Sequence, residues 1–195
     1  MTWWFKARQT HTVLVAALVA FTLLLALVHN VTVMLPSLTG GSAHVVLTLF
    51  VPVPLIAALA HCLDSRARDP ETTGVRPIAV LDVALSLATV LASGVLSFCT
   101  ALWVEDGQPL AAVRNTAFLV GLMLSARPLM GLSSSLVPVG WLLAVCLLGF
   151  RSTNDPAWWT VVPEPPGTPH AAVGAALALV IGLSIQLRTA RTLKA

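Results

Sequence analysis

Residues 64–76 read Asp64-Ser-Arg-Ala-Arg-Asp-Pro-Glu-Thr-Thr-Gly-Val-Arg76, and they form the densest run of charge in the chain. The whole sequence is 57% hydrophobic and only 10% charged. Apolar stretches long enough to cross a bilayer, which takes roughly 20 mainly apolar residues, lie on both sides of the run. Because Arg and Lys concentrate on the cytoplasmic side of membrane proteins, the three arginines predict that this loop faces the cytoplasm.

The composition excludes a soluble globular domain. The mean hydropathy is +0.88, and charged residues are too few for a water-facing surface, which is usually about a quarter charged. The net charge of +3 comes from arginines and lysines assigned to the inner face, so a nucleic-acid partner is not expected. Heavy use of Ala, Leu and Val, with arginine above lysine, is typical of a high-GC bacterium. We therefore expect a multi-pass protein of the bacterial plasma membrane, with the bilayer as its first partner.

The hydrophobic runs predict an all-α polytopic fold with six transmembrane helices and a single transmembrane domain over residues 1–195. The predicted spans are residues 12–28, 44–63, 78–104, 110–126, 129–150 and 170–187. The N-terminal residues 1–10, with Trp3 and Trp4 beside Lys6 and Arg8, fit either a short interfacial anchor or an unstructured tail.

The basic residues set the predicted orientation. With both termini cytoplasmic, only Arg114 and Arg151 remain outside, and every other Arg and Lys lies on the inner face. The opposite orientation would reverse this imbalance, so both termini are predicted to be cytoplasmic.

Prolines and glycines predict breaks in these spans. The outer loop, residues 30–43, is uncharged and is interrupted by Pro36 and two glycines. Pro52 and Pro54 fall near the middle of the second span, where a proline removes a backbone hydrogen bond and predicts a kink. The Arg127-Pro128 pair is expected to close the fourth span.

Few charged residues lie within the predicted spans. Asp82, one turn into the third span, is predicted to pair with Arg76 or to face other helices, and an interfacial carboxylate reaching toward water is the alternative. Arg114, in the first turn of the fourth span, is predicted to reach the outer surface or to pair with Glu105 or Asp106. Small residues at helical spacing in the last span predict close helix packing: Ala171, Gly174, Ala175, Ala178 and Gly182.

The segment 151–169, before the last span, holds Trp158 and Trp159 among the prolines Pro156, Pro163, Pro165 and Pro166. Proline excludes a regular span here, and the indoles favour the outer interface. The segment is predicted either to dip into the membrane and return or to lie on its surface.

The sequence gives no support for an enzyme. A Ser133–His170 dyad would need hydrogen-bond contact, but the topology places these residues at opposite faces. The histidines lack zinc-ligand spacing, and Cys62, Cys99 and Cys146 are interpreted as small core residues. The phosphate-binding Gly-Lys-Ser/Thr motif is missing. No catalytic, cofactor or metal residue is therefore predicted, and any ATP would be bound by a partner chain.

The layout resembles the six-helix permease subunits of type-2 ABC exporters, particularly short actinobacterial members. The resemblance covers most of the chain. It is carried by the tryptophan-bearing N-terminus, the charged 64–76 loop, Arg114-Asn115, Ala126-Arg127-Pro128 and the Trp158-Trp159 segment. It implies a membrane-spanning subunit of an ATP-driven exporter, which pairs with a second copy or a sister permease and works with a separate ATP-binding subunit.

The resemblance also implies roles for two segments. Residues of the inner loop would contact the ATPase, namely Arg66, Arg68, Asp69 and Glu71, and Trp158 and Trp159 would belong to an outer gate. The inner loop departs from the family pattern because Pro70 and Gly74 leave little room for a docking helix. A solvated turn that only sets topology is the alternative for the loop. For the chain, the alternative is a non-transporting membrane accessory, immunity or assembly protein.

Overall fold

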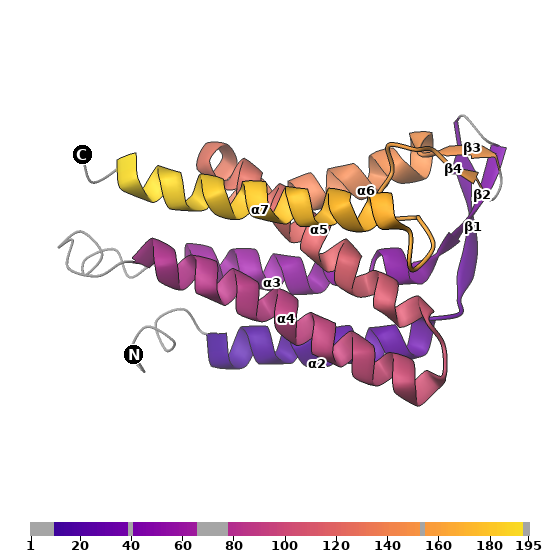
Figure 1. The fold of residues 1–195 in the computed structure, drawn as a ribbon, viewed down its shortest axis with the longest axis horizontal. Coiled ribbons are helices and arrows are strands. Elements are labelled where there is room, and N and C mark those ends of the chain that lie inside the picture. The colour runs from indigo at the N-terminus through magenta and orange to yellow at the C-terminus, as the bar shows by residue number, and fades with distance from the viewer. Residues whose placement is uncertain (1–9, 39–40, 66–77, 153–154, 193–195) are drawn as a thin grey trace.

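The computed structural model describes residues 10–38, 41–65, 78–152 and 155–192. Its helices run along one long axis, and its short strands gather at one end of the bundle (Figure 1). We call this the hairpin end. The opposite end, where α3 finishes at Asp64 and α4 begins, is the Asp64 end, and the first described helix starts and the last one finishes there (Figure 1). The candidate ATPase-contact residues and Arg76 lie outside the described residues.

The elements follow one another in a simple up-and-down order. They are the π-helical turn η1 Thr10–Leu14, α2 Val15–Val28, β1 Thr32–Ser37, β2 Gly41–Val46, η2 Leu47–Leu49, α3 Pro52–Asp64, α4 Ile78–Val104, α5 Gln108–Met130, η3 Gly131–Ser135, α6 Leu136–Leu148, β3 Phe150–Ser152, β4 Asp155–Pro156 and α7 Pro169–Thr192.

The described chain is mostly helical and contains five helices long and apolar enough to cross a membrane. They are His11–Val28, Leu47–Asp64, Ala79–Val104, Gln108–Met130 and Pro169–Thr189. The predicted fifth span, residues 129–150, is instead a shorter apolar helix, Ser133–Leu148. Its first part is the 3₁₀ turn η3, which rises about 2.0 Å per residue rather than about 1.5 Å.

The predicted kink in the second span is wrong. The α-helix α3 begins at Pro52, so Pro52 and Pro54 occupy its first turn, after the 3₁₀ turn η2. A proline there removes no helical hydrogen bond, because the first N–H groups of a helix have no partner within it. The prolines therefore start a regular helix instead of bending a longer one.

The fourth helix also ends later than predicted. It continues through Pro128 to Met130 and ends at Gly131, whose N–H donates to the carbonyl of Arg127. Gly131 has a φ of 55°, a backbone conformation that glycine adopts without the steric penalty of a side chain. The glycine, rather than the Arg-Pro pair, terminates α5.

The predicted outer loop contains strands that an all-α fold does not include. β1 and β2 pair in antiparallel register, from Thr32 opposite Val46 to Ser37 opposite Gly41. The hairpin is attached to the end of α6, because the N–H of Leu38 donates to the carbonyl of Leu147 over 2.9 Å. The hydroxyl of Ser37 donates to the same carbonyl. A carbonyl in the last turn of a helix is otherwise unpaired.

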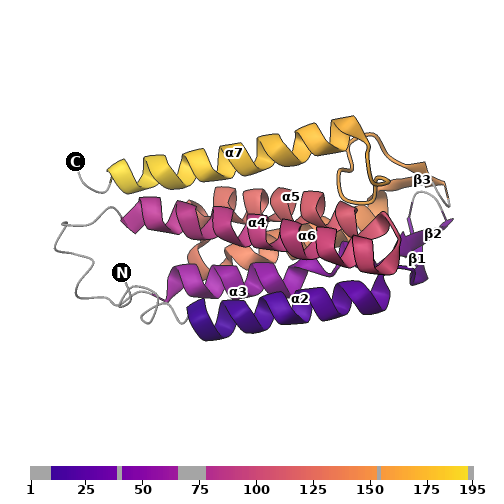
Figure 2. The same cartoon turned by 60° about the horizontal axis from the view of Figure 1, so that its bottom comes forward.

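Helix α5 lies in the middle of the bundle, with α2 and α7 on opposite sides in both views (Figures 1 and 2). Its closest neighbour is α7. A Cβ atom on Gly121 of α5 or on Gly182 of α7 would clash with the backbone of the opposite helix. Ala171 and Ala175 of α7 are also buried. The small residues of the last span thus serve close helix packing, as predicted.

Candidate functional site

A row of polar side chains follows the buried face of α4. Its members recur every three or four residues, so they lie on one side of the helix. All are at most 5% exposed: Asp82, Ser86, Thr89, Ser93, Ser97 and Thr100. The opposite side of α4 is apolar and exposed, including Leu91, Val95, Phe98 and Leu102. This distribution is expected of a helix whose outer face meets lipid.

The row extends through most of the predicted membrane thickness, since Asp82 and Thr100 are about 27 Å apart at ~1.5 Å per residue. Several of its hydroxyls bond to carbonyls of their own helix, as Ser86 does to Asp82 and Thr89 to Leu85. Within the described chain, Ser97 Oγ has no hydrogen-bond partner although the side chain is fully buried. We call this row the α4 polar face.

At the Asp64 end, Arg127 of α5 lies between two carboxylates. Its side chain is 6% exposed and lies 3.4 Å from Asp64 Oδ1 and 3.7 Å from Asp82 Oδ2. It also donates to the carbonyl oxygen of Leu63 over 2.6 Å. Asp64 is the last residue of α3 and Asp82 lies in the first turns of α4. One guanidinium therefore joins the two helices that flank residues 66–77.

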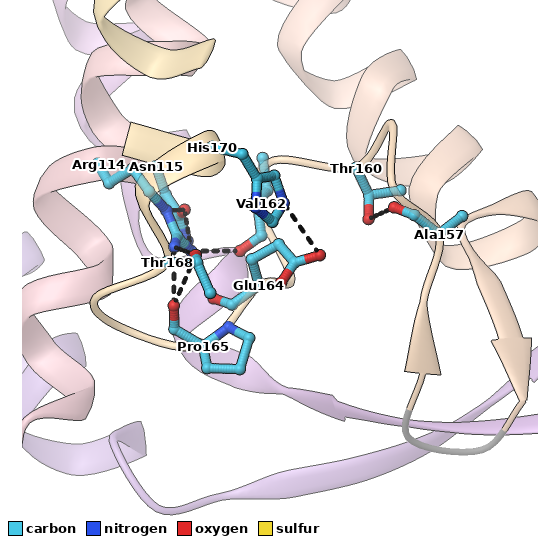
Figure 3. Close-up of polar contacts among 9 residues, drawn as sticks. All are labelled: Arg114, Asn115, Ala157, Thr160, Val162, Glu164, Pro165, Thr168 and His170. Carbon is cyan, nitrogen blue, oxygen red and sulfur yellow. Dashed lines mark hydrogen bonds and ion pairs between the residues drawn. The ribbon is translucent and has the colours of Figure 1, made fainter. Parts of the chain in front are cut away.

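At the hairpin end, Arg114 of α5 binds the segment that precedes α7 (Figure 3). Its guanidinium donates to the carbonyl oxygens of Glu164 at 2.6 Å, Pro165 at 3.0 Å and Val162 at 3.2 Å. It also donates to the hydroxyl of Thr168 at 3.1 Å. The planar fork of arginine, with five N–H donors, can satisfy several carbonyls of one folded-back segment.

Two neighbours support this contact. The buried side chain of Asn115 accepts hydrogen bonds from Arg114 at 3.3 Å. His170, at the start of α7, lies 3.4 Å from Glu164 Oε1 (Figure 3). The sequence predicted that Arg114 reaches the outer surface or pairs with Glu105 or Asp106. Its described partners are in the 162–168 segment rather than Glu105 or Asp106, because that segment turns back over α5 and presents its carbonyls.

The two tryptophans of the predicted outer gate differ in their surroundings. Trp158 is 75% exposed. Trp159 is half-buried and meets Trp141 of α6 edge-on, with ring centroids 5.8 Å apart. Trp141 in turn lies 5.5 Å from Phe118 of α5. Trp159 is therefore part of an aromatic contact that ties the 157–168 segment to α5 and α6, whereas Trp158 is exposed.

The sequence marks Asp82 and Arg114 as polar residues within the spans but does not show their described partners. Arg127 is predicted from sequence as a helix end and as part of the Ala126-Arg127-Pro128 motif, and not as an ion-pair partner. The spacing of Ser86, Thr89, Ser93 and Ser97 was a readable signal, since polar residues every three or four positions mark one face of a helix. Which helix covers that face could not be read from the spacing.

The described residues contain no group of three or more His, Cys, Asp or Glu side chains that could hold a metal ion. Comparison with known proteins found no match: no family model fits the chain, and no curated protein or solved structure is significantly similar to it. The geometry of the bundle is therefore the basis for assigning a function.

Proposed function

We propose that this chain is the membrane-spanning subunit of an ATP-driven exporter that works with a separate ATP-binding subunit. One observation carries the proposal. Helix α5 binds both helices that flank residues 66–77 through Arg127, and it binds the segment before α7 through Arg114 at the other end of the bundle. The same helix thus contacts the two helices that flank the loop to which the resemblance gives ATPase contact, and the segment to which it gives outer gating.

The contacts offer a physical route for coupling. A force on residues 66–77 acts on the ends of α3 and α4, which hold Arg127 by ion pairs. Buried ion pairs resist separation because a lone charge in a low-dielectric interior is costly. Movement of α5 would then shift Arg114 and the 162–168 carbonyls. A connected, packed element of this kind can carry coupling between distant sites.

The energy source belongs to a partner in this proposal. The only lysines are Lys6 and Lys194, and neither follows a glycine as the phosphate-binding loop requires. The export complex would contain two membrane subunits, as a homodimer or with a sister permease, in the bacterial plasma membrane. Both termini and the Asp64 end would face the cytoplasm, where an ATPase has access to ATP.

Purification of the full chain in mild detergent tests the proposal. A nucleotide-binding chain should copurify in stoichiometric amount, and reversal of charge in R66E/R68E should release it. Arg151→Glu is the matched control, because this exposed arginine lies at the hairpin end, and it should leave the complex intact.

Recovery of the chain without an ATPase would reject the exporter assignment and favour a non-transporting membrane accessory, immunity or assembly protein. An ATPase that is retained by R66E/R68E would reject the contact at residues 66–77. Either result is read directly from the subunit composition and does not require knowledge of the substrate.

A further inference from the structure

An apolar groove opens on the side of the bundle between α2 and α4. It has a volume of about 470 Å³ and is lined by Leu18, Val19 and Thr22 of α2 and by Ala92, Val95 and Leu96 of α4. Both stretches belong to helices long and apolar enough to span the membrane. The groove is therefore open to hydrocarbon rather than to water, and its walls suit an aliphatic chain.

The single polar side chain of this lining does not call for a polar ligand. The hydroxyl of Thr22 already donates to the carbonyl of Leu18 over 2.9 Å. A hydrocarbon chain in the groove would therefore leave no side-chain hydrogen-bonding group of the lining without a partner. An unpaired polar group is the main energetic cost of placing apolar atoms against protein.

The same turns of α4 carry the α4 polar face on an adjacent side. Ser93 and Ser97 alternate with the groove residues Ala92 and Leu96, and both serines are fully buried. Ser97 Oγ has no hydrogen-bond partner among the residues that the structure describes. A buried hydroxyl without a partner is unfavourable, so its position beside a ligand-sized groove points to a polar group that is bound in another state.

Two contacts fix which part of α5 covers these serines. Arg127 of α5 meets Asp82 of α4, and a Cβ on Gly94 of α4 would touch Val113 of α5. This antiparallel register places Asn115 and Thr116, both buried, at the level of Ser93, and places Ala111 and Ala112, also buried, at the level of Ser97. The surroundings of Ser93 thus offer hydroxyl and amide groups, whereas the part of α5 beside Ser97 is apolar. Arg127 is shared by two carboxylates, and Arg114 is directed to the carbonyls of the 162–168 segment, so neither guanidinium is directed to these serines.

From the groove and the α4 polar face together, we propose a binding site for an amphiphile that enters from the bilayer. Its aliphatic chain occupies the α2–α4 groove, and its uncharged head group, rich in hydroxyls or amides, bonds to Ser93 and Ser97. The head group gains access when α4 moves away from α5. This inference rests on the proposed function, since the amphiphile would be the exported substrate.

Photolabelling of the full chain in nanodiscs tests the site without an ATPase. The probe is a monoacylglycerol with a diazirine in its chain, and the comparison probe is a fatty acid with the same tail and an anionic head. The monoacylglycerol should label the peptide containing Ala92, Val95 and Leu96 in a saturable way and several-fold more strongly than the fatty acid does.

Three variants separate the two halves of the site. Ala92→Phe fills the groove and should reduce labelling at least fivefold. Leu91→Phe adds the same side chain at a neighbouring position that is exposed outside the groove and should preserve labelling. Ser97→Ala should abolish the preference for the monoacylglycerol without lowering the thermal unfolding temperature, because it removes a hydroxyl that has no partner in the closed bundle.

Labelling that does not saturate, or that is equal in the Ala92 and Leu91 variants, would show ordinary contact with bilayer lipid and overturn the proposal. A preference that survives Ser97→Ala would overturn the assignment of the head group. The failure of the proposed function is seen separately, in the copurification of a nucleotide-binding chain, because labelling needs no such partner.

Discussion

The two arginines of α5 are separated by about 20 Å along one helix, at ~1.5 Å per residue, yet they are stabilised in different ways. Arg127 is buried and meets two carboxylates and one carbonyl. Arg114 is half-buried and meets three carbonyls, a hydroxyl and an amide oxygen. The first compensates charge between helices, whereas the second holds a segment without regular secondary structure in shape.

This difference predicts how the two ends respond to change. Removing Arg127 leaves the carboxylates of Asp82, which is 2% exposed, and of Asp64, which is 16% exposed, where little water can replace the lost cation. Removing Arg114 leaves carbonyls of a segment that includes the exposed Pro165 and Gly167, so water can hydrate them. Loss of Arg127 at the Asp64 end should therefore destabilise the whole bundle, whereas loss of Arg114 at the hairpin end should loosen only the segment that it binds.

The largest effect is expected for Arg127→Leu. It leaves Asp64 and Asp82 without their shared cation and should lower the free energy of unfolding by roughly 3–5 kcal/mol, the usual cost of breaking a buried ion pair. Thermal unfolding of the purified protein in detergent measures the change.

A rescue variant sharpens this prediction. Combining Arg127→Leu with Asp64→Asn and Asp82→Asn removes the stranded charges and should restore most of the lost stability. If the triple variant is no more stable than Arg127→Leu alone, the ion pairs are not the reason for the loss.

A smaller, local effect is expected for Arg114→Leu. The loss of its hydrogen bonds should cost about 1–3 kcal/mol, and residues 157–168 should become sensitive to protease while the helices stay protected. Limited proteolysis with mass spectrometry locates the cuts. Arg151→Leu, which changes an exposed arginine at the same end, is the control. Cleavage that spreads evenly over the helices would contradict a local role.

The smallest effect is expected for His170→Gln. His170 is 54% exposed beside Glu164, and ion pairs at such positions contribute at most about 1 kcal/mol. Its unfolding temperature should stay close to that of the unchanged protein and well above that of Arg114→Leu. A loss as large as that of Arg114→Leu would mean that the histidine, and not the arginine, organises this end.

The sequence predicted most helices because hydrophobic length is a local property. The third span, residues 78–104, coincides with α4. The small residues of the last span predicted its close packing, since no other residue permits two helix backbones to approach so nearly. Two of the errors occurred at prolines. Pro52 and Pro128 have the same local chemistry at the start and near the end of a helix, so the sequence pattern alone did not place the helix boundaries.

The candidate site depended on contacts between distant parts of the chain. The sequence marked Asp82 and Arg114 as costly in a membrane. It predicted that Asp82 pairs with Arg76, which lies outside the described residues, or faces other helices, and that Arg114 reaches the outer surface or pairs with Glu105 or Asp106. Only the tertiary structure brings Arg127 between Asp64 and Asp82, and folds the 162–168 carbonyls over Arg114.

The composition alone indicated a membrane protein, because each long apolar run is energetically unfavourable in contact with water. The tertiary structure decided which polar groups meet, because a hydrogen bond or ion pair depends on distances of a few ångströms between segments. The α4 polar face shows both contributions. The spacing of its residues can be read from the sequence, whereas its burial against α5 depends on how the helices pack.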